Sequence, residues 1–526
     1  TGFSSVDVGK NKRSGHLFRH VQHYYDLAAS DHIHIGDNAW SDHRVPAKMG
    51  ITAILYQPKP LHQKRLQQEA IFTDKTAFLA EWRQATELAY NPPLTTISPE
   101  LTTEEYKEIW SLGVASAPLW VGLCAWIAEQ ALAHELDRLL FLTREGEIFY
   151  QIYRAIFPDH RLNHLSLPPS EIMGISRQAS FAASLSSLNM TEMNRSWASH
   201  RVQNLRGFFA LFELDAANFT EILSEYNLNL DSIITNPMKD QNFAAFINHP
   251  IIQESANAAI ARQKSLLIDY ARQCGIKPGA KIGLVDIGWR GGIIDNLARI
   301  LPDSKFYGLF LGLRRYINAQ PENCQKFAYG LNENLGDSVR LFESFAALEA
   351  LCQARAGSVI GYERIGDKIQ PKRPVTLEEQ IAYDRFTLPY QAGVIDAARI
   401  AARFLPENAV SSFDLKPAAL AIWRQLQSSP PRRLAREILA LPQQDIFGLG
   451  EVFRMADVPS LTTIILSPLR AQHRRTLYQF IRRAQWSSAI FAHRDISWPH
   501  RLLLFLVFKA ANWLKILLLW CRSWYR

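Results

Sequence analysis

The stretch Ile282–Asp286 (Ile-Gly-Leu-Val-Asp), followed directly by the loop Ile287–Gly292 (Ile-Gly-Trp-Arg-Gly-Gly), decides the fold expected for most of this chain. The apolar run predicts a buried strand, and the glycine-rich loop predicts a sharp connection to the next element. Residues 293–297 then predict a helix, and residues 306–311 predict another strand. Strand, short loop, helix and strand in this order are typical of a parallel α/β sheet.

A second unit of the same form lies earlier in the chain. Residues 138–142 predict a buried strand, residues 143–147 a loop, and residues 148–157 a helix. If the two strands are neighbours, the charged residues of their loops meet in one crevice at the carboxyl edge of the sheet. The candidate ligand-binding residues are Arg144, Glu145, Asp286, Trp289 and Arg290.

Two interpretations of these loop residues stay open. Arginines at helix N-termini would suit a phosphate or a carboxylate, which a guanidinium binds through two parallel hydrogen bonds. Alternatively, Arg144 with Asp286, or Glu145 with Arg290, forms an ion pair that only stabilises the sheet edge. The loop Gly288–Gly292 lacks the spacing of a dinucleotide-binding or P-loop motif, and no Gly-x-Ser-x-Gly sequence is present.

The N-terminal stretch His32–Asp42 (His-Ile-His-Ile-Gly-Asp-Asn-Ala-Trp-Ser-Asp) carries a different signal. Alternating His and Ile predict a half-buried strand, with Asp37 at its end. A helical segment from Asp42 to Met49 and a second strand at 51–56 follow. Two carboxylates at a strand end make an oxygen site that suits Mg²⁺. The alternative is that Asp42 caps a helix and Asp37 starts a turn.

Gly36-Asp37 followed by Asp42 resembles the fourth motif of the haloacid dehalogenase (HAD) superfamily of phosphohydrolases. The preceding Ser4–Gly15 resembles the third motif of that family, with Lys12 as its lysine and Lys10 as the second choice. The resemblance implies that Lys12 steadies the phosphoryl charge and that Asp37 and Asp42 hold Mg²⁺. The family's nucleophilic Asp-x-Asp belongs upstream of this lysine, and no such motif follows an apolar strand further along. We therefore expect a fragment that holds half of an active site.

The resemblance extends further along the chain, through Leu142–Glu147, Ile175–Ala179, Val285–Gly291 and residues 348–362. These motifs are similar to those of HAD-type hydrolases with a long C-terminal extension, which are linked to glycosyltransferases of bacterial surface-polysaccharide synthesis. Glu145 stands where that family typically has Asp. The resemblance implies a phosphorylated small molecule or sugar phosphate as ligand and a glycosyltransferase as a partner.

The expected fold class is α/β, with the C-terminal part of a HAD-like, Rossmann-type domain followed by a second α/β domain. The second domain carries large helical insertions and leads into a helical C-terminal region. Helices are expected at 110–135, which is apolar nearly all round, at 251–272, at 341–353 and over 377–447, with a strand at 359–362. Breaks are expected at Pro406, Pro417 and Pro430-Pro431. The expected parts are a HAD-like portion (1–60), a helical linker (61–100), the α/β extension (101–370), a helical region (371–499) and a basic amphipathic helix (500–526).

Composition limits the classes of protein that the chain can belong to. With 526 residues, of which 48% are apolar, the chain can bury two or three cores. Its five cysteines form no Cys-x-x-Cys pair, which argues against a structural zinc site and favours a reducing cytoplasm. Eleven Arg and Lys against one Asp lie in Leu466–Arg526, so the net charge of +8 belongs to the C-terminus.

The apolar segment 502–520 is long enough to span a bilayer, but Lys509, Asn512 and Lys515 draw a polar stripe along it. An amphipathic helix at the inner surface of the membrane is therefore expected, with attraction of the arginines to anionic lipid. Packing of the apolar face on the protein is the alternative. Nucleic acid is not an expected partner, because the long apolar runs do not suit phosphate tracking.

The leading hypothesis is a Mg²⁺-dependent phosphohydrolase module with an α/β extension, inactive as this fragment, that serves surface-polysaccharide or glycoconjugate synthesis. The rival is a non-catalytic, membrane-associated scaffold that binds a sugar phosphate or a glycosyltransferase. A third possibility is an extension that is itself a transferase working through its Arg, Glu and Asp loops.

Overall fold

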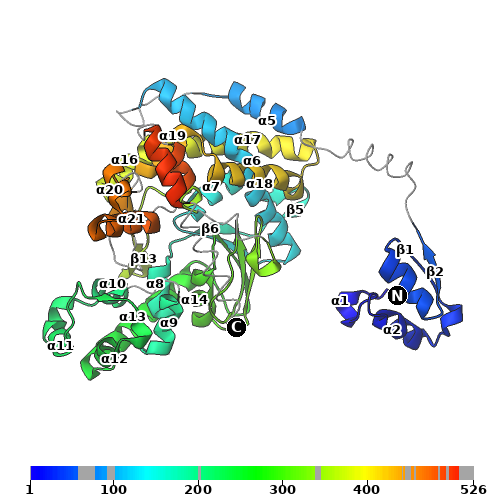
Figure 1. The fold of residues 1–526 in the computed structure, drawn as a ribbon, viewed down its shortest axis with the longest axis horizontal. Coiled ribbons are helices and arrows are strands. Elements are labelled where there is room, and N and C mark those ends of the chain that lie inside the picture. The colour runs from blue at the N-terminus through cyan, green and yellow to red at the C-terminus, as the bar shows by residue number, and fades with distance from the viewer. Residues whose placement is uncertain are drawn as a thin grey trace. The chain divides into compact units, whose positions relative to one another are not determined.

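The computed structural model of the protein contains two compact units, Thr1–Lys75 and Thr76–Arg526 (Figure 1). We call them the N-terminal unit and the C-terminal unit. The structure describes residues 2–56, 77–91, 101–198, 203–337, 345–440, 442–444, 452–454, 458–483, 486–492 and 497–508.

The N-terminal unit holds two parallel strands, β1 (Ile33–Gly36) and β2 (Thr52–Leu55), with Ile33 opposite Thr52. The side of β1 that faces the protein carries histidine, since the rings of His32 and His34 contact Phe18 edge-on. Ile33 and Ile35 are 63% and 62% exposed. The helical elements are α1 (Ser5–Val8), α2 (His16–Tyr25), a π-helical turn (Ala39–Arg44) and α3 (Val45–Lys48).

The predicted helical segment after Asp37 therefore begins three residues earlier than expected. Asn38 is its N-cap, because the Asn38 side chain accepts hydrogen bonds from the backbone N–H groups of Trp40 and Ser41. The alternative in which Asp42 caps a helix is wrong, since Asp42 lies within the π-helical turn.

A five-stranded parallel sheet forms the centre of the C-terminal unit, in the order β11-β10-β9-β3-β6. Leu140 of β3 lies opposite Leu284 of β9, so the two strands that the sequence singles out are direct neighbours. The parallel α/β architecture is confirmed. The strands are β3 (Arg138–Leu142), β6 (Ser170–Met173), β9 (Lys281–Asp286), β10 (Lys305–Phe310) and β11 (Cys324–Ala328).

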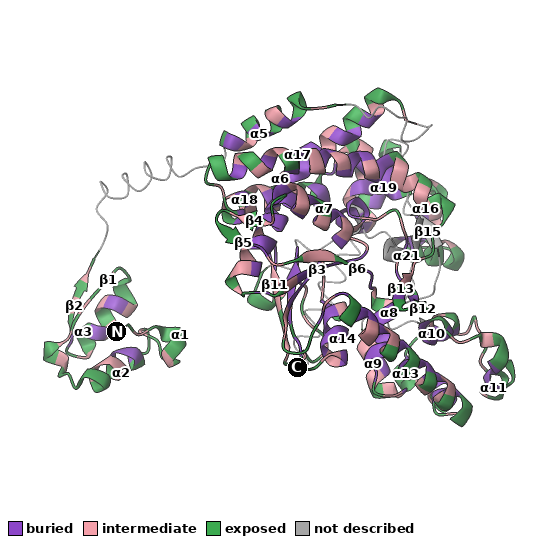
Figure 2. Cartoon of the chain, turned by 180° about the vertical axis from the view of Figure 1, so that it is seen from behind, coloured by how far each residue is buried: buried purple, intermediate pink, exposed green. Residues whose placement is uncertain are grey.

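Helices cover both faces of this sheet. Alternate residues of β3 enter different cores: Leu139 and Phe141 pack in one, Leu140 and Leu142 in the other. The first core includes α6 (Thr103–Ala133), α7 (Gly146–Ile156), α15 (Ala346–Leu351), α17 (Leu388–Glu407), α18 (Ser412–Ser428) and α19 (Arg432–Ala440). The second includes α8 (Arg177–Phe181), α13 (Pro250–Gln273), α14 (Gly292–Ile300) and the hairpin β12 (Gly361–Ile365) with β13 (Lys368–Lys372). Figure 2 shows most of β3 as buried.

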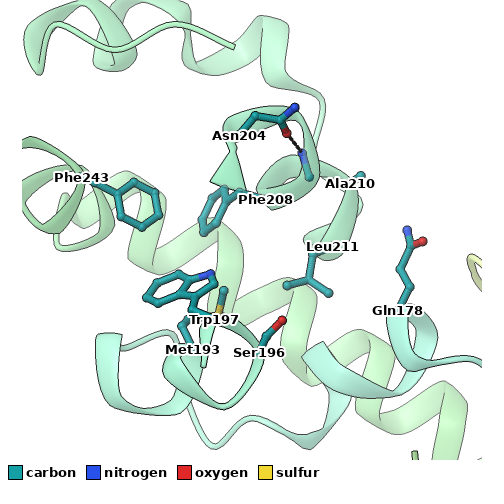
Figure 3. Close-up of a pocket in the computed structure, with 10 residues that line it drawn as sticks. Gln178, Met193, Ser196, Trp197, Asn204, Phe208, Ala210, Leu211 and Phe243 are labelled. Carbon is teal, nitrogen blue, oxygen red and sulfur yellow. Dashed lines mark hydrogen bonds between the residues drawn. The ribbon is translucent and has the colours of Figure 1, made fainter. Parts of the chain in front are cut away.

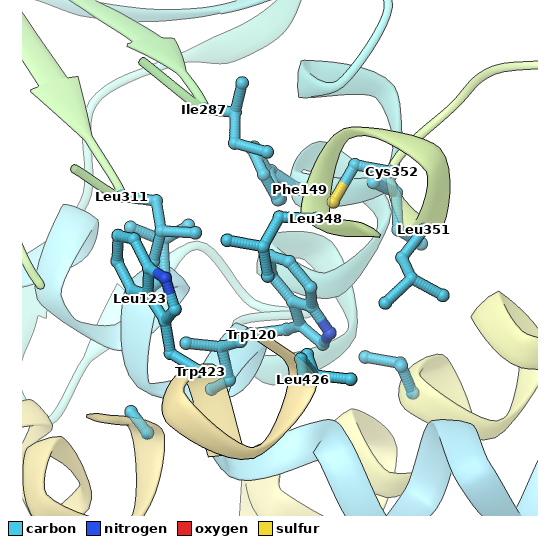
Figure 4. Close-up of a cluster of buried hydrophobic side chains, with 14 of the residues drawn as sticks. Trp120, Leu123, Phe149, Ile287, Leu311, Leu348, Leu351, Cys352, Trp423 and Leu426 are labelled. Atoms are coloured by element: carbon cyan, nitrogen blue, oxygen red, sulfur yellow. The ribbon is translucent and has the colours of Figure 1, made fainter. Parts of the chain in front are cut away.

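Large side chains from distant parts of the sequence meet in the first core. Figure 4 shows Trp120 of α6, Leu348 of α15 and Trp423 of α18 in one cluster with Ile287 and Leu311, which directly follow β9 and β10. Residues of the ranges 101–370 and 371–499 therefore share one core. Pro417 lies inside α18, so the break expected there is wrong. The breaks expected at Pro406 and at Pro430-Pro431 are confirmed to within two residues, since α17 ends at Glu407 and α18 ends at Ser428.

Helix α6 is long and apolar enough to cross a membrane, but 72% of its most apolar stretch is buried inside the protein. It is thus the buried core helix that its sequence predicts. Thr102 caps it through a capping box with Glu105. Of the C-terminal tail, the described part ends with an apolar helix, Trp498–Phe508, whose Leu504 and Phe508 pack into the first core. The predicted polar stripe lies in residues 509–526, outside the described residues.

The remaining described elements are mostly helical and surround these layers. A third core joins the insertion between β6 and β9 around Phe208, Phe243 and Phe246. The helices are α5 (Ala77–Leu88), α9 (Met190–Trp197), α10 (Leu205–Phe212), α11 (Thr220–Glu225), α12 (Gln241–Ile247), α16 (Leu377–Ala382), α20 (Leu461–Leu466), α21 (Ala471–Arg483) and α22 (Ser487–Ala492). Short strand pairs are β4 (Arg161–Leu162) with β5 (Leu165–Ser166), β7 (Gln203–Asn204) with β8 (Ile233–Ile234), and β14 (Pro442–Gln444) with β15 (Val452–Arg454).

The crossing of α6 and α17 gives a test of this packing. A Cβ atom at Gly113 would lie 2.0 Å from the backbone oxygen of Tyr390, so Gly113→Ala must push the helices apart. Helix propensity alone predicts that this substitution stabilises the protein by about 1 kcal/mol. We expect a net loss of about 1–3 kcal/mol, because the core cannot absorb the added atom. Urea unfolding measures it, with Ala115→Ser on the exposed face of the same helix as control. An unchanged or higher stability would contradict the close crossing.

Candidate functional site

The N-terminal unit brings Lys12 and Asp42 into direct contact. Lys12 Nζ lies 2.5 Å from Asp42 Oδ1, and the Asp42 side chain is almost fully buried. His34 Nε2 lies 3.0 Å from the same oxygen, and the backbone N–H of Asn38 donates to Oδ2. Lys10, the second choice for the family lysine, lies beside His20 instead.

These contacts set the charge state of Asp42. Burial alone would raise the pKa of Asp42, but the hydrogen bonds from Lys12, His34 and Asn38 outweigh it and lower the pKa to about 2. Gly36 makes room for this arrangement, since a Cβ atom there would lie 2.5 Å from the Cβ atom of Asp42. The glycine of the Gly36-Asp37 pair is therefore needed to make room for Asp42.

As these residues are placed, Asp42 is not open to the expected Mg²⁺. Both oxygens of Asp42 already accept hydrogen bonds, and the charge of Lys12 neutralises the carboxylate. Asp37 is exposed at the end of β1 and is the remaining acid of the pair. Within the described ranges, no group of three His, Cys, Asp or Glu side chains could hold a metal ion. Mg²⁺ binding by Asp42 would require that Lys12 and His34 move away.

Loss of the Asp42 carboxylate should loosen the N-terminal unit. The pKa of Asp42 is lowered in the folded protein, so its stabilisation is present above the ordinary pKa of Asp and disappears as the pH falls towards 2. We expect Asp42→Asn to cost no more than about 2 kcal/mol at pH 7, since Lys12 is partly exposed to water.

Hydrogen exchange of peptides that cover β1 and β2, measured by mass spectrometry on the whole chain, would report this effect. Exchange should be faster in Asp42→Asn at pH 7 and should approach that of the parent protein as the pH falls below about 4. The exposed Asp26 gives the matched control, Asp26→Asn. Equal exchange in the parent and in Asp42→Asn at pH 7 would show that the ion pair of Asp42 with Lys12 does not stabilise the N-terminal unit.

In the C-terminal unit, the loops after β3 and β9 begin at the point where the strand order reverses. Going along the chain, β6 is added on one side of β3, and β9, β10 and β11 on the other. In open α/β sheets, the crevice beyond the carboxyl ends of the strands at such a point is where ligands bind. Glu145 and Asp286 lie close enough here for the charge of Glu145 to raise the pKa of Asp286.

Among the described residues of this sheet edge, Arg144 does not pair with Asp286, and Glu145 does not pair with Arg290. Asp286 accepts a hydrogen bond from the backbone N–H of Ile287, at 2.7 Å. Arg290 Nη1 donates to the backbone oxygen of Arg315, at 3.0 Å. The charged loop residues are therefore not used up by pairing with one another.

A cleft of about 320 Å³ opens at the β9–α14 loop. Its volume falls at the low end of the range of small-molecule sites, roughly 300–1,000 Å³. Five arginines line it, against the acids Asp286 and Asp295: they are Arg177, Arg195, Arg290, Arg299 and Arg314. We call it the arginine cleft. Arg144 and Glu145 are not among its lining residues. Of the four charged residues that we expected in one crevice, only Asp286 and Arg290 line this cleft.

The arginines of the cleft lie close enough to affect one another. Burial and then the charge of Arg314 lower the pKa of Arg290, and burial and then the charge of Arg299 lower the pKa of Arg195. Arg195 Nε and Arg314 Nε are buried without a hydrogen-bond partner among the described residues. The protein therefore leaves these guanidinium groups incompletely satisfied.

The N-terminus of α14 opens into the same cleft. Gly291 precedes this nine-residue helix with φ of 69°, and no side chain caps it. A left-handed conformation of this kind favours glycine. Since the first N–H groups of a helix have no partner within the helix, they add to the positive potential of the arginines.

The acids of this region are held in a low-dielectric environment. Burial and then the charge of Glu145 raise the pKa values of both Asp286 and Glu349. A raised pKa favours the uncharged carboxyl, which cancels less of the charge of the nearby arginines. Asp295 is neutralised by Lys326, whose Nζ lies 2.6 Å from Asp295 Oδ1.

Trp289 forms a wall of the cleft. Its indole N–H donates to Glu349 at 2.8 Å, and its ring stacks on Phe345 at 3.9 Å between centroids. These contacts fix the loop through the core, so Trp289 has a structural role in addition to lining the site.

A smaller pocket lies between α9, α10 and α12 and is shown in Figure 3. Its volume is about 40 Å³, and Trp197, Phe208 and Phe243 line it together with Met193. This space is enough for one or two water molecules and too small for a metabolite.

Sequence reasoning missed four of the five cleft arginines: Arg177, Arg195, Arg299 and Arg314. Arg177 lies in the stretch Ile175–Ala179, which carries a family resemblance, and this was the one available signal. The other three come from the last turns of α9 and α14 and from the loop after β10, and nothing in their local sequence marks them.

Comparison of the chain with models of known protein families and with curated proteins finds no match.

Proposed function

We propose that the C-terminal unit binds a phosphorylated small molecule, of the sugar-phosphate class, in the arginine cleft. The observation that carries this proposal is the meeting of five arginines and the uncapped N-terminus of α14 on one cleft at the reversal of the strand order. Phosphate is the group that such a site binds best, because guanidinium donors and helix N–H groups both suit its oxygens. The family resemblance adds the expectation of a sugar phosphate used in surface-polysaccharide synthesis.

A thermal shift experiment on the whole chain tests this proposal. Glucose 1-phosphate at 100 times its dissociation constant should stabilise the protein by about 2.7 kcal/mol, while glucose at the same ionic strength should not. Arg290→Gln should weaken binding about tenfold or more, because it removes a charged donor. Arg403→Gln is the control, since the Arg403 side chain is 73% exposed and lies outside the cleft. Equal shifts with glucose and with glucose 1-phosphate would exclude a phosphate site.

A phosphohydrolase role of the N-terminal unit is the second candidate. The contact between Lys12 and Asp42 favours it, because the HAD resemblance pairs this lysine with the acids of the fourth motif. Lys12 would steady phosphoryl charge, and Asp37 is the exposed acid that remains open to a ligand.

The measurement for this second candidate is hydrolysis of p-nitrophenyl phosphate with Mg²⁺ by a form of the protein that carries the family's nucleophilic Asp-x-Asp upstream of Lys12, with and without Asp37→Asn. The resemblance predicts that any Mg²⁺-dependent rate falls by at least about a hundredfold in the variant, as for loss of a group that acts at the reacting centre. The exposed Asp7 supplies the control, Asp7→Asn. A rate that Asp37→Asn leaves unchanged would exclude Asp37 from the reaction.

A further inference from the structure

The positive charge of the arginine cleft is divided between two places along α14. Arg290 lies just before the N-terminus of this helix, and Arg299 lies in its last turn. Gly292 and Arg299 are seven residues apart, which corresponds to about 10 Å along a helix axis. The long Arg299 side chain can shorten this distance because helical side chains point towards the N-terminus.

Each place holds more than one guanidinium group. Arg314, from the loop after β10, lies near Arg290: the backbone N–H of Arg314 donates to the backbone oxygen of Trp289, and Arg290 donates to that of Arg315. Arg177, the fifth arginine of the cleft, is also close enough for its charge to act on Arg290. Arg195, from α9, lies near Arg299, because Asn318 donates to the backbone oxygen of Arg195 and Arg299 donates to that of the adjacent Ala319. Arg299 donates to the backbone oxygen of Ala319, which holds it in place without using its charge. Arg195 donates to the backbone oxygen of Ser184 and also lies 3.3 Å from the carboxylate of Glu192, so Arg299 supplies most of the net charge at this end.

The residues between these two places add little net charge. Ile293, Asn296 and Tyr316 line this part of the cleft. Asp295 also lies here, but its ion pair with the almost fully buried Lys326 cancels its charge. The cleft thus has two cationic ends and a nearly neutral middle.

We infer that the arginine cleft takes a ligand with two separate anionic groups, one at Arg290, Arg314 and the N-terminus of α14, the other at Arg195 and Arg299. An uncharged body about as long as a sugar ring joins the two groups. This inference rests on the proposed function and deepens it, since a single phosphate would engage only one of the two ends. A hexose bisphosphate or a sugar phosphate with a carboxylate belongs to this class of ligand.

Calorimetry of the whole chain with alkyl phosphonates tests the inference. The probes are methylphosphonate, methylene bisphosphonate, and the bisphosphonates of propane and hexane. We expect a bisphosphonate with a spacer of three to six carbons to bind about tenfold more tightly than methylphosphonate, the contribution of a second charge-assisted contact. Methylene bisphosphonate should not share this gain, because its two groups are too close together.

Variants at the two ends separate the possible outcomes. Arg299→Gln should remove the preference for the long bisphosphonate over methylphosphonate, whereas Arg299→Lys should keep the preference. Arg290→Gln should weaken all probes, and Arg403→Gln none. If methylphosphonate binds but spacer length has no effect, or if Arg299→Gln keeps the preference, the two-anion inference is overturned and the proposed phosphate site stands. If no probe binds, the proposed function fails as well.

Discussion

The pairing of β3 with β9 is the constraint on which the C-terminal unit depends. Leu140 and Phe141 lie opposite Leu284 and Val285 in a parallel ladder, and helices cover both sides of it. A parallel strand that is buried on both faces must be apolar along its whole length, so charged residues are excluded until the strand ends. The first positions where charge can appear are the loops, and the pairing brings those two loops together. The candidate site follows from the same interaction that builds the two cores.

The charges of the cleft show how the protein tolerates several arginines close together. Placing like charges near one another is unfavourable, and partial burial increases the cost. Lys326 and Asp295 cancel one another, Glu333 lies 3.7 Å from Arg314, and Glu192 lies 3.3 Å from Arg195. Burial and then the charge of Glu145 raise the pKa of Asp286, which favours its uncharged form. The five arginines that line the cleft still outnumber these acids. An arrangement made only for stability would gain from more acids here, so the imbalance favours a site for anions.

Sequence predicted the central part of the fold because its signals are local. The strand at residues 138–142 was predicted with its observed bounds, and the strand and helix around Asp286 differ by a few residues, since continuous apolar runs followed by glycine are strong signals. The edge strands β6 and β11 were missed because Ser-Glu-Ile-Met and Cys-Gln-Lys-Phe-Ala are mixed in polarity; they are strands because a neighbouring strand offers hydrogen bonds. Proline predicts a helix break at residue 417, yet α18 continues through Pro417. Burial of Leu415 and Trp423 outweighs the loss of the one backbone hydrogen bond that proline cannot donate.

The difference between local and tertiary signals also explains which residues of the candidate site could be predicted. Arg290 and Asp286 lie next to a strand that sequence reveals, whereas Arg195, Arg299 and Arg314 reach the cleft from elements brought together only by the tertiary fold. No spacing rule connects residue 195 to residue 314. Asp42 shows the converse. The sequence reveals its place in a motif, but not that Lys12, His34 and Asn38 already bind its carboxylate oxygens.

The two units therefore offer phosphate very different environments. In the N-terminal unit, the one cation near Asp42 is already paired at 2.5 Å, so an incoming phosphate would have to compete with a buried carboxylate for Lys12. Moving Lys12 onto a ligand leaves the buried carboxylate of Asp42 without its cation, which is unfavourable even though Lys12 itself is partly exposed to water. In the C-terminal unit, Glu192 and Glu333 lie near Arg195 and Arg314, but the five arginines of the cleft outnumber the acids around them, so a phosphate meets net positive charge. The arginine cleft therefore suits phosphate binding better than the Gly36-Asp37 motif does.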